Sequence, residues 1–408
     1  MQRRHVWPQG HWSWPIKVTH KHGLRAGDML FVGGQVDLDP AGNVRHPNDL
    51  HAQVRGVVAN IRTVLEGLDG GLDDLVKLVV YYVQKGGTDE RAMLAVLRQA
   101  LGIGPMPVVS TVPVPFLAYP GMVVEIDATA MRAAGGGRMS RVLAEPRSRW
   151  AWPKDAFFPQ GLRCGRMLFA GGQQGRGADG RIRRPGDLVG QSHDTLENAL
   201  AVLAELGADA GDAVKFNAYY LGHGTAADWE ASARARASYF AEPGPAATGI
   251  PLPRFADAEA LFQIELWAML AEDGRRLARS HSWPDGHWDW PIHLPYKHGL
   301  KCDEMIFLGG QVALTPKAEV IAPGDTPAQT RLAMANIARV LAEFGADLND
   351  VVKVNAFYEG TGTADNLHDN LSIRSASFRE PGPVTTGVPL PTLAYPKMMI
   401  EIDTIAMV

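Results

Sequence analysis

The hydrophobic pattern in the first third of the chain alternates between strand-like and helix-like segments. The apolar run Met29–Gln35 ends in glycines, which predicts a buried strand and a tight turn. Apolar residues at helical spacing predict a helix over 49–68, with Asp49 as its N-cap. By the same criteria, strands are expected over 75–83, 108–115 and 122–131, and a second helix over 89–101.

We predict the order ββαβαββ for each copy, that is, one sheet with two helices on one face. Pro113 and Pro115 alternate along one strand, so that strand is expected to lie at an edge or to be irregular. The sheet face without helices must also be covered, because an open apolar face of that size would aggregate.

The whole pattern occurs three times without a gap. Gly33-Gly34-Gln35 recurs after 138 residues and again after another 138, and so does the motif Trp12-x-Trp14-Pro15. We therefore predict three tandem α+β domains, over 1–135, 139–273 and 277–408. Three copies can cover one another's open faces, which predicts an intramolecular pseudo-trimer that needs no second chain, although it may still self-associate. Fusion also frees each interdomain cleft to diverge from the other two.

Composition narrows the class of protein. The chain has 408 residues and a net charge of −4, so we expect no basic surface for nucleic acid. No apolar run approaches the ~18–20 residues that cross a bilayer, and the N-terminal residues do not resemble a signal peptide. Two cysteines, Cys164 and Cys302, fit a reducing compartment and are interpreted as small core residues. We expect a cytoplasmic protein without membrane partners.

Several of these features together resemble the Rid family, the YjgF-type reactive-intermediate deaminases. They are the Gly-Gly-Gln motif after an apolar strand, Gln53 and Asn60 in the first helix, the segment 74–77, and the terminal strand 124–128. The resemblance implies a chorismate-mutase-like fold, with helices outside and sheets forming a central barrel. It also implies that the three copies act as one fused trimer, with ligand clefts between the copies.

The resemblance points to two site positions. Family deaminases clamp a substrate carboxylate with an arginine on the penultimate strand, and this arginine is absent here, which argues against an ordinary 2-imino-acid substrate. That position maps to Val109, Ala247 and Thr385. The family's glutamate on the last strand, which could shuttle a proton, maps to Glu125, Gln263 and Glu401. From the residues alone, these could instead be solvated polar positions on a half-exposed strand.

A cleft tyrosine of the family maps to three different residues, which indicates that the clefts have diverged. They are His20, Phe158 and Tyr296. His20 is a candidate general acid or base near neutral pH, and an exposed loop histidine is the alternative.

Further candidates could hold the substrate. Hydroxyl groups beside the missing arginine could donate to a ligand, or could be ordinary strand residues: Ser110, Thr111, Thr248 and Thr386. Arg98 on the second helix is a candidate anion anchor. This position is arginine in all three copies, and one position on the middle strand is lysine in all three (Lys77, Lys215 and Lys353). For both positions, structural ion pairing or packing is the alternative to a role in binding.

Trp12 and Trp14 lie on one face of an extended segment and could form an aromatic pocket, or could fasten the N-terminal arm to its neighbour. Histidines near them, such as His5 and His11, lack a third ligand at metal-site spacing, so we predict no metal.

Two functions follow as hypotheses. The first is a hydrolase that acts, without a cofactor, on an enamine, imine or related C–N bond of a small and possibly cyclic metabolite. In this hypothesis, Glu125 or Glu401 donates and accepts the protons. The second is a non-catalytic protein that binds a small metabolite, a hypothesis that the missing arginine keeps open.

Overall fold

The computed structural model describes residues 2–146, 149 and 158–408, so Trp150 and Trp152 of the second tryptophan motif lie outside the described residues. Its elements recur three times in one order. The first repeat comprises β1 (Arg3–Val6), β2 (Gly23–Ala26), β3 (Met29–Gln35), α1 (Leu50–Gly67), η1 (Leu72–Asp74), β4 (Leu75–Val83), α2 (Glu90–Leu101), β5 (Val108–Val114) and β6 (Val124–Met131).

The other two repeats have equivalent elements. The second comprises β7 (Arg141–Ala144), β8 (Gly161–Cys164), β9 (Met167–Gln174), α3 (Leu188–Glu205), η2 (Ala210–Asp212), β10 (Ala213–Leu221), α4 (Ala226–Ala237), β11 (Ala246–Leu252) and β12 (Phe262–Met269). The third comprises β13 (Arg279–Ser282), β14 (Gly299–Cys302), β15 (Met305–Gln311), α5 (Thr326–Ala342), η3 (Leu348–Asp350), β16 (Val351–Glu359), α6 (Asp365–Ala376), β17 (Val384–Leu390) and β18 (Ile400–Met407).

The helices begin where the sequence predicts. Asp49 accepts a hydrogen bond from the Ala52 backbone N–H and starts α1, and Asp89 does the same for α2 through Ala92. Strands β3 and β4 have the predicted bounds. The short strand β1 was not predicted, because its sequence Arg-Arg-His-Val has no apolar pattern. No described helix is both long enough and apolar enough to span a bilayer.

Each repeat forms a six-stranded mixed sheet. In the first sheet the order is β1-β2-β3-β6-β4-β5, in which only β4 and β5 are parallel. The predicted ββαβαββ order is confirmed, with one additional N-terminal strand. The proline-bearing strand β5 lies at the sheet edge, as its sequence predicts.

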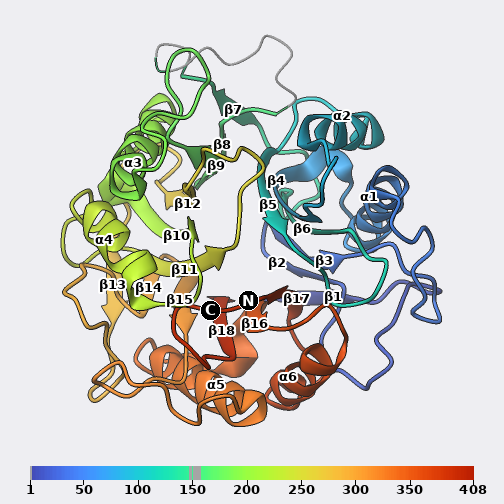
Figure 1. Ribbon diagram of the computed structural model, residues 1–408. Coiled ribbons are helices and arrows are strands. Elements are labelled where there is room, and N and C mark those ends of the chain that lie inside the picture. The colour runs from blue at the N-terminus through green and yellow to red at the C-terminus, as the bar shows by residue number, and fades with distance from the viewer. Residues whose placement is uncertain (1, 147–148, 150–157) are drawn as a thin grey trace.

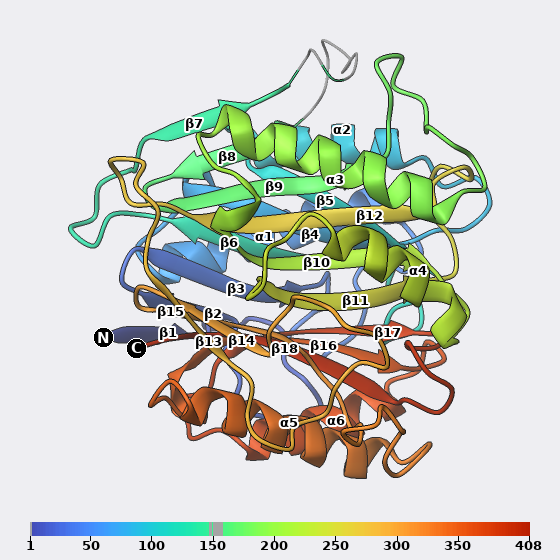
Figure 2. The ribbon, with the colours of Figure 1, turned by 90° about the vertical axis from the view of Figure 1, so that its left-hand side faces the viewer.

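The three sheets surround a common centre and the helices lie outside them (Figure 1). In the side view of Figure 2, α3 and α4 lie over the outer face of the second sheet. The inner faces pack against each other through residues from all three repeats. Phe31, Phe169 and Phe307, which are equivalent by the repeat, share one apolar cluster with both free cysteines. The sheets are thus covered on both faces, and the predicted pseudo-trimer is confirmed.

The first glycine of each Gly-Gly-Gln motif allows an edge strand of one repeat to approach the next repeat. These glycines lie within strands and not in the tight turn that we predicted. A Cβ atom there would lie within 2.5–2.7 Å of a carbonyl oxygen on the neighbouring edge strand. The contacts are Gly33 with Thr385, Gly171 with Val109, and Gly309 with Ala247. Together they join the three repeats in a closed ring.

Candidate functional site

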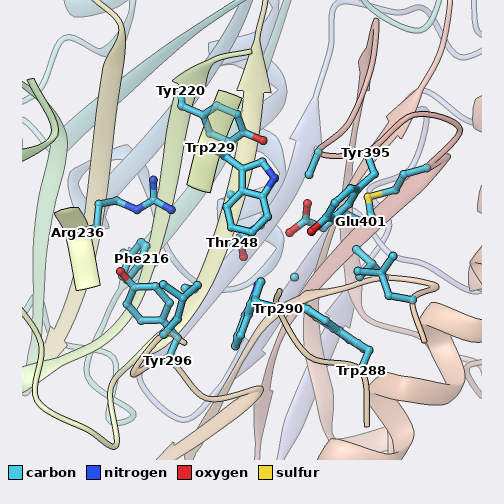
Figure 3. A pocket seen from close by; sticks show the side chains of 18 residues that line it. Phe216, Tyr220, Trp229, Arg236, Thr248, Trp288, Trp290, Tyr296, Tyr395 and Glu401 are labelled. Carbon is cyan, nitrogen blue, oxygen red and sulfur yellow. The ribbon is translucent and has the colours of Figure 1, made fainter. Parts of the chain in front are cut away.

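Two described clefts between repeats contain many of the predicted site residues. The larger cleft lies between the second and third repeats and has a volume of about 620 Å³, which includes space open to solvent (Figure 3). The smaller cleft lies between the third and first repeats and has a volume of about 400 Å³ on the same measure. The larger cleft is lined by Thr248, Tyr296 and Glu401, and the smaller cleft by Trp12, Trp14 and Glu125.

Each cleft contains one buried carboxyl group from the last strand of a repeat. Glu401 on β18 is 7% exposed and Glu125 on β6 is 6% exposed. Burial raises the pKa of each to about 8, and the neighbouring Asp403 or Asp127 adds to the rise. Each glutamate is therefore mostly protonated at pH 7, which excludes the alternative of a solvated strand carboxylate.

The second glycine of the Gly-Gly-Gln motif makes room for this carboxyl group. A Cβ atom on Gly310 would lie 1.8 Å from Oε1 of Glu401, and one on Gly34 would lie 1.9 Å from Oε1 of Glu125. The sequence revealed the motif but not this purpose, since the glutamate follows some 90 residues later.

Substituting this glycine should displace the carboxyl group. We expect Gly310→Ala to displace the Glu401 carboxyl group from its buried position. The pKa of Glu401 should then fall from about 8 toward the ordinary value of 4.5. Carbon-13 NMR titration of the labelled glutamate measures the change. Gly137→Ala is the control, since no atom lies within 4 Å of its Cβ position. An unchanged pKa in Gly310→Ala would contradict the assigned role of this glycine.

The arginine that recurs on the second helix of each repeat has different surroundings in the three copies. Arg236 on α4 lines the larger cleft and Arg374 on α6 lines the smaller cleft, and both are buried. Arg98, which we predicted as the anion anchor, is exposed on α2. The structure therefore favours its two equivalents for that role.

Both buried arginines are held by their own helices and keep one nitrogen atom unpaired. Arg374 donates from Nε to Asn370 at 2.9 Å and from Nη1 to Thr385 at 2.7 Å. Arg236 donates from Nη1 to Ser232 at 3.0 Å. Nη2 of Arg374 and Nε of Arg236 have no hydrogen-bond partner among the described residues. Thr385 on β17 thus orients the arginine of the neighbouring helix α6.

Aromatic side chains enclose the larger cleft. The rings of Trp229, Trp290 and Tyr395 lie around the space beside Glu401 (Figure 3). Nε1 of Trp229 and the hydroxyl groups of Tyr220 and Tyr395 are buried without a partner among the described residues. Trp229, Tyr220 and Tyr395 were not predicted as site residues from the sequence. Trp229 carried a signal, because the repeat places Arg91 and Leu367 at its position.

The predicted tryptophans both line a cleft and fasten the N-terminal arm. Trp12 and Trp14 pack edge to face at 4.6 Å between ring centroids, and Trp14 stacks on His22. Nε1 of Trp12 donates to Oε1 of Gln35 at 3.2 Å. The two hypotheses for this motif are therefore compatible.

Among the described residues, a polar network lies at the interface between the first and second repeats. Nε2 of Gln263 donates to the Thr111 carbonyl at 2.9 Å, and Oε1 of Gln263 accepts from Gln174 at 3.1 Å. Arg176 donates to Gln174 at 2.8 Å and pairs with Asp257 at 3.1 Å. At the equivalent positions of the other two interfaces stand Glu, Val, Leu and Tyr. This interface therefore lacks the buried carboxylic acid.

The candidate hydroxyl groups serve mainly the interfaces. Thr248 donates to Asp403 at 3.1 Å, and Thr386 donates to Asp127. The hydroxyl of Ser110 is buried without a described partner. Three buried ion pairs cross the interfaces beside them, which confirms the ion-pair alternative for the repeated lysines. They are Lys77 with Glu265, Lys215 with Asp403, and Lys353 with Asp127.

Two of the predicted site residues belong to the protein core. His20 is fully buried and its Nδ1 lies 3.0 Å from the Pro383 carbonyl oxygen. Burial lowers the pKa of His20 to about 3, so it stays neutral and does not suit acid–base catalysis near pH 7. Phe158 packs into the apolar core beneath the first sheet. The third residue at this repeat position, Tyr296, does line a cleft.

Comparison with known proteins agrees with this architecture. The family model described as Endoribonuclease L-PSP matches residues 16–132, 153–270 and 291–408. A RutC family protein of Pyrococcus abyssi is 34% identical over 113 residues, which is 28% of this chain and 85% of that protein. A mouse protein named 2-iminobutanoate/2-iminopropanoate deaminase is 34% identical over 59 residues, which is 14% of this chain and 44% of that protein.

A solved structure has a similar fold over most of the chain. The crystal structure of a chorismatase superposes with a TM-score of 0.53 and 12% identity, and the match covers 82% of this chain and 93% of the other. At that identity the likeness concerns the fold alone. The family model and the relatives together show that the chain belongs to the Endoribonuclease L-PSP family, the YjgF or Rid family, and contains three tandem copies of its domain.

Proposed function

We propose that the larger cleft hydrolyses the C=N bond of a small imine, or of the enamine from which it forms, and releases ammonia. The observation that carries this proposal is the buried Glu401 carboxyl group, in a cleft walled by apolar and aromatic side chains, where burial raises its pKa to about 8. A buried carboxylic acid whose pKa lies near the working pH is suited to proton transfer in both directions. The name of the mouse relative supports the same reaction class.

The proposed reaction uses one carboxyl group twice. Glu401 first gives its proton to the imine nitrogen, and the resulting carboxylate accepts a proton as water adds to the carbon. The product is a carbinolamine, in which carbon holds both OH and NH₂. Glu401 then returns a proton to the nitrogen and receives the hydroxyl proton, while the C–N bond breaks to give a carbonyl and ammonia. The Gly249 backbone N–H, which hydrogen-bonds to Glu401, keeps the carboxyl group oriented between these steps.

The three interfaces differ in their fitness for this reaction. Gln263 cannot transfer a proton in this way, and its amide is already bonded to Thr111 and Gln174. The smaller cleft holds Glu125 with the same raised pKa, but Leu367 stands there in place of Trp229. The larger cleft combines the acid with more space and more unpaired polar atoms, so we assign the reaction to it.

The pH dependence of the rate should follow the ionisation of Glu401. Because the reaction needs the protonated acid, and burial raises its pKa to about 8, kcat/KM is expected to be level below pH 8. Above pH 8 it should fall about tenfold per pH unit as the carboxyl group ionises. Initial rates of ammonia release between pH 3.5 and 10 measure this profile. A decline centred near pH 4.5 would instead indicate an ordinary solvated glutamate.

The reaction itself is tested with imines generated in situ from amino acids by an amino-acid oxidase. Faster conversion of the imine to ammonia with the protein present, compared with buffer, supports the proposal. If one of these imines or its product binds stoichiometrically but no imine is turned over, the protein is a metabolite-binding member of its family and the enzymatic proposal is wrong.

A further inference from the structure

The larger cleft has an uneven distribution of charge. Of the residues that line it, only Arg236 and Glu401 carry ionisable groups of the Arg, Lys, His, Asp or Glu type. Burial raises the pKa of Glu401 to about 8, so near pH 7 the carboxyl group is mainly neutral while the guanidinium remains charged. The cleft without ligand therefore carries about one positive charge, which a monoanion would neutralise.

The guanidinium is placed to meet such an anion. Arg236 is 5% exposed, its Nη1 is bonded to Ser232, and its Nε has no hydrogen-bond partner among the described residues. A buried charged donor left unpaired is costly, and an anionic acceptor removes that cost. The Tyr296 hydroxyl lies beside the guanidinium without a well-formed hydrogen bond to it. Ala247, which also lines this cleft, has only a methyl side chain.

The arginine and the acid lie on opposite sides of the cleft, with aromatic rings between them. Figure 3 shows Arg236 on one side, Glu401 on the other, and Trp229 and Trp290 in the intervening region. A ligand that reaches both groups would lie against these rings. Flat rings gain most from such walls, because aromatic faces and edges pack closely against one another.

The remaining polar atoms of the cleft are neutral. The pKa of Tyr395 is raised to about 12 by burial, and that of Tyr220 is raised further, so both hydroxyl groups stay protonated. With Nε1 of Trp229, they offer three donors that have no partner among the described residues. Oxygen atoms on a ring substituent would satisfy them.

We infer that the larger cleft binds a planar, ring-containing monoanion, whose anionic group is held by Arg236 and whose ring packs against Trp229 and Trp290. The inference deepens the proposed function, on which it rests for the chemistry at Glu401, by naming the substrate class. It also makes the anion anchor a helix arginine instead of the absent strand arginine. The smaller cleft, with Leu367 in place of Trp229, should favour a ligand without a ring.

Calorimetric titration of the full chain with three simple probes tests the inference. Benzoate carries both ring and charge, benzamide carries the ring without charge, and acetate carries the charge without the ring. We expect benzoate to bind at least tenfold more tightly than either of the others. Benzamide binding as tightly as benzoate would overturn the role of the charge, and acetate binding as tightly would overturn the role of the ring.

Substitutions then locate the binding in the larger cleft. Arg236→Gln should weaken benzoate binding at least tenfold, and Trp229→Leu, which copies the smaller cleft, at least fivefold. Arg234→Gln is the matched control, since this arginine on the same helix has a side chain that is 57% exposed, and binding should stay within twofold of the wild type. Arg236→Lys keeps the charge and should retain more of the benzoate affinity than Arg236→Gln. Unchanged benzoate affinity in a folded Arg236→Gln protein would overturn the inference, and so would unchanged affinity in Trp229→Leu if Arg236→Gln does not fold.

The two proposals can fail separately. If the protein releases ammonia from the imine of alanine but binds benzoate no better than acetate, the ring-anion inference is wrong and the proposed function stands. If benzoate binds as described but no imine is turned over, the proposed function is wrong and the ligand class stands.

Discussion

Replacing Glu401 by glutamine is expected to lower turnover in the larger cleft by about 10²–10⁴-fold, the usual contribution of a positioned acid or base. The amide has nearly the same shape as the protonated carboxylic acid, and it can still accept the hydrogen bond from the Gly249 backbone N–H. It cannot give up and regain a proton in the reaction. Ligand affinity should therefore change little, while kcat for ammonia release falls.

The control for this substitution is a carboxylate in the same repeat that is far more accessible. Glu319 is exposed in the loop after β15, and Glu319→Gln should leave turnover unchanged. Full activity in a folded Glu401→Gln protein would remove Glu401 from the mechanism. If the activity were instead lost in Glu125→Gln, the reaction would belong to the smaller cleft.

Much of the fold was predictable because the patterns that define it are local or repeated. The periodicity of residues 49–68 and the cap at Asp49 indicate α1, and the apolar run 75–83 indicates β4. The step of 138 residues revealed the three copies, and from them the pseudo-trimer. Strand β1 was not predictable, because it pairs with β2 through its backbone and its side chains are mostly polar.

The site was less predictable, since it depends on contacts between repeats. Glu125 and Glu401 came from the family resemblance, but their burial follows from Gly34 and Gly310, which lie far away in sequence. Arg98 is exposed while its equivalents Arg236 and Arg374 are buried at the clefts, and the sequence carries no direct record of this difference in burial between repeats. The available signal of divergence between the clefts was a repeat position at which the three copies carry different residues, as at Trp229.

The ion pairs across the three interfaces show how the repeats hold one another in register. Lys215 of the second repeat is 2% exposed and lies 3.2 Å from Asp403 of the third, which is fully buried. Its Nζ also donates to the Leu308 carbonyl at 3.1 Å. Asp403 in turn accepts hydrogen bonds from Asn355 and Thr248. Each polar group in this network has a partner within it. Removing one member therefore leaves a buried polar or charged group unpaired, which costs a large amount of folding free energy.

We expect Lys215→Met to destabilise the protein by about 3–5 kcal/mol, because it leaves the Asp403 carboxylate buried without a countercharge. The double variant Lys215→Met with Asp403→Asn should recover much of that loss, since both charges are then gone and the amide keeps the size of the carboxylate. Denaturant unfolding at pH 7 measures both free energies of unfolding. Lys317 is an exposed lysine in the third repeat, so Lys317→Met is the control.

Equal destabilisation in the single and double variants would show that packing around the lysine stem, and not the charge of Asp403, determines the stability of this interface. If the charge does determine it, acid should stabilise Lys215→Met relative to the wild type, because protonating Asp403 removes the unpaired charge.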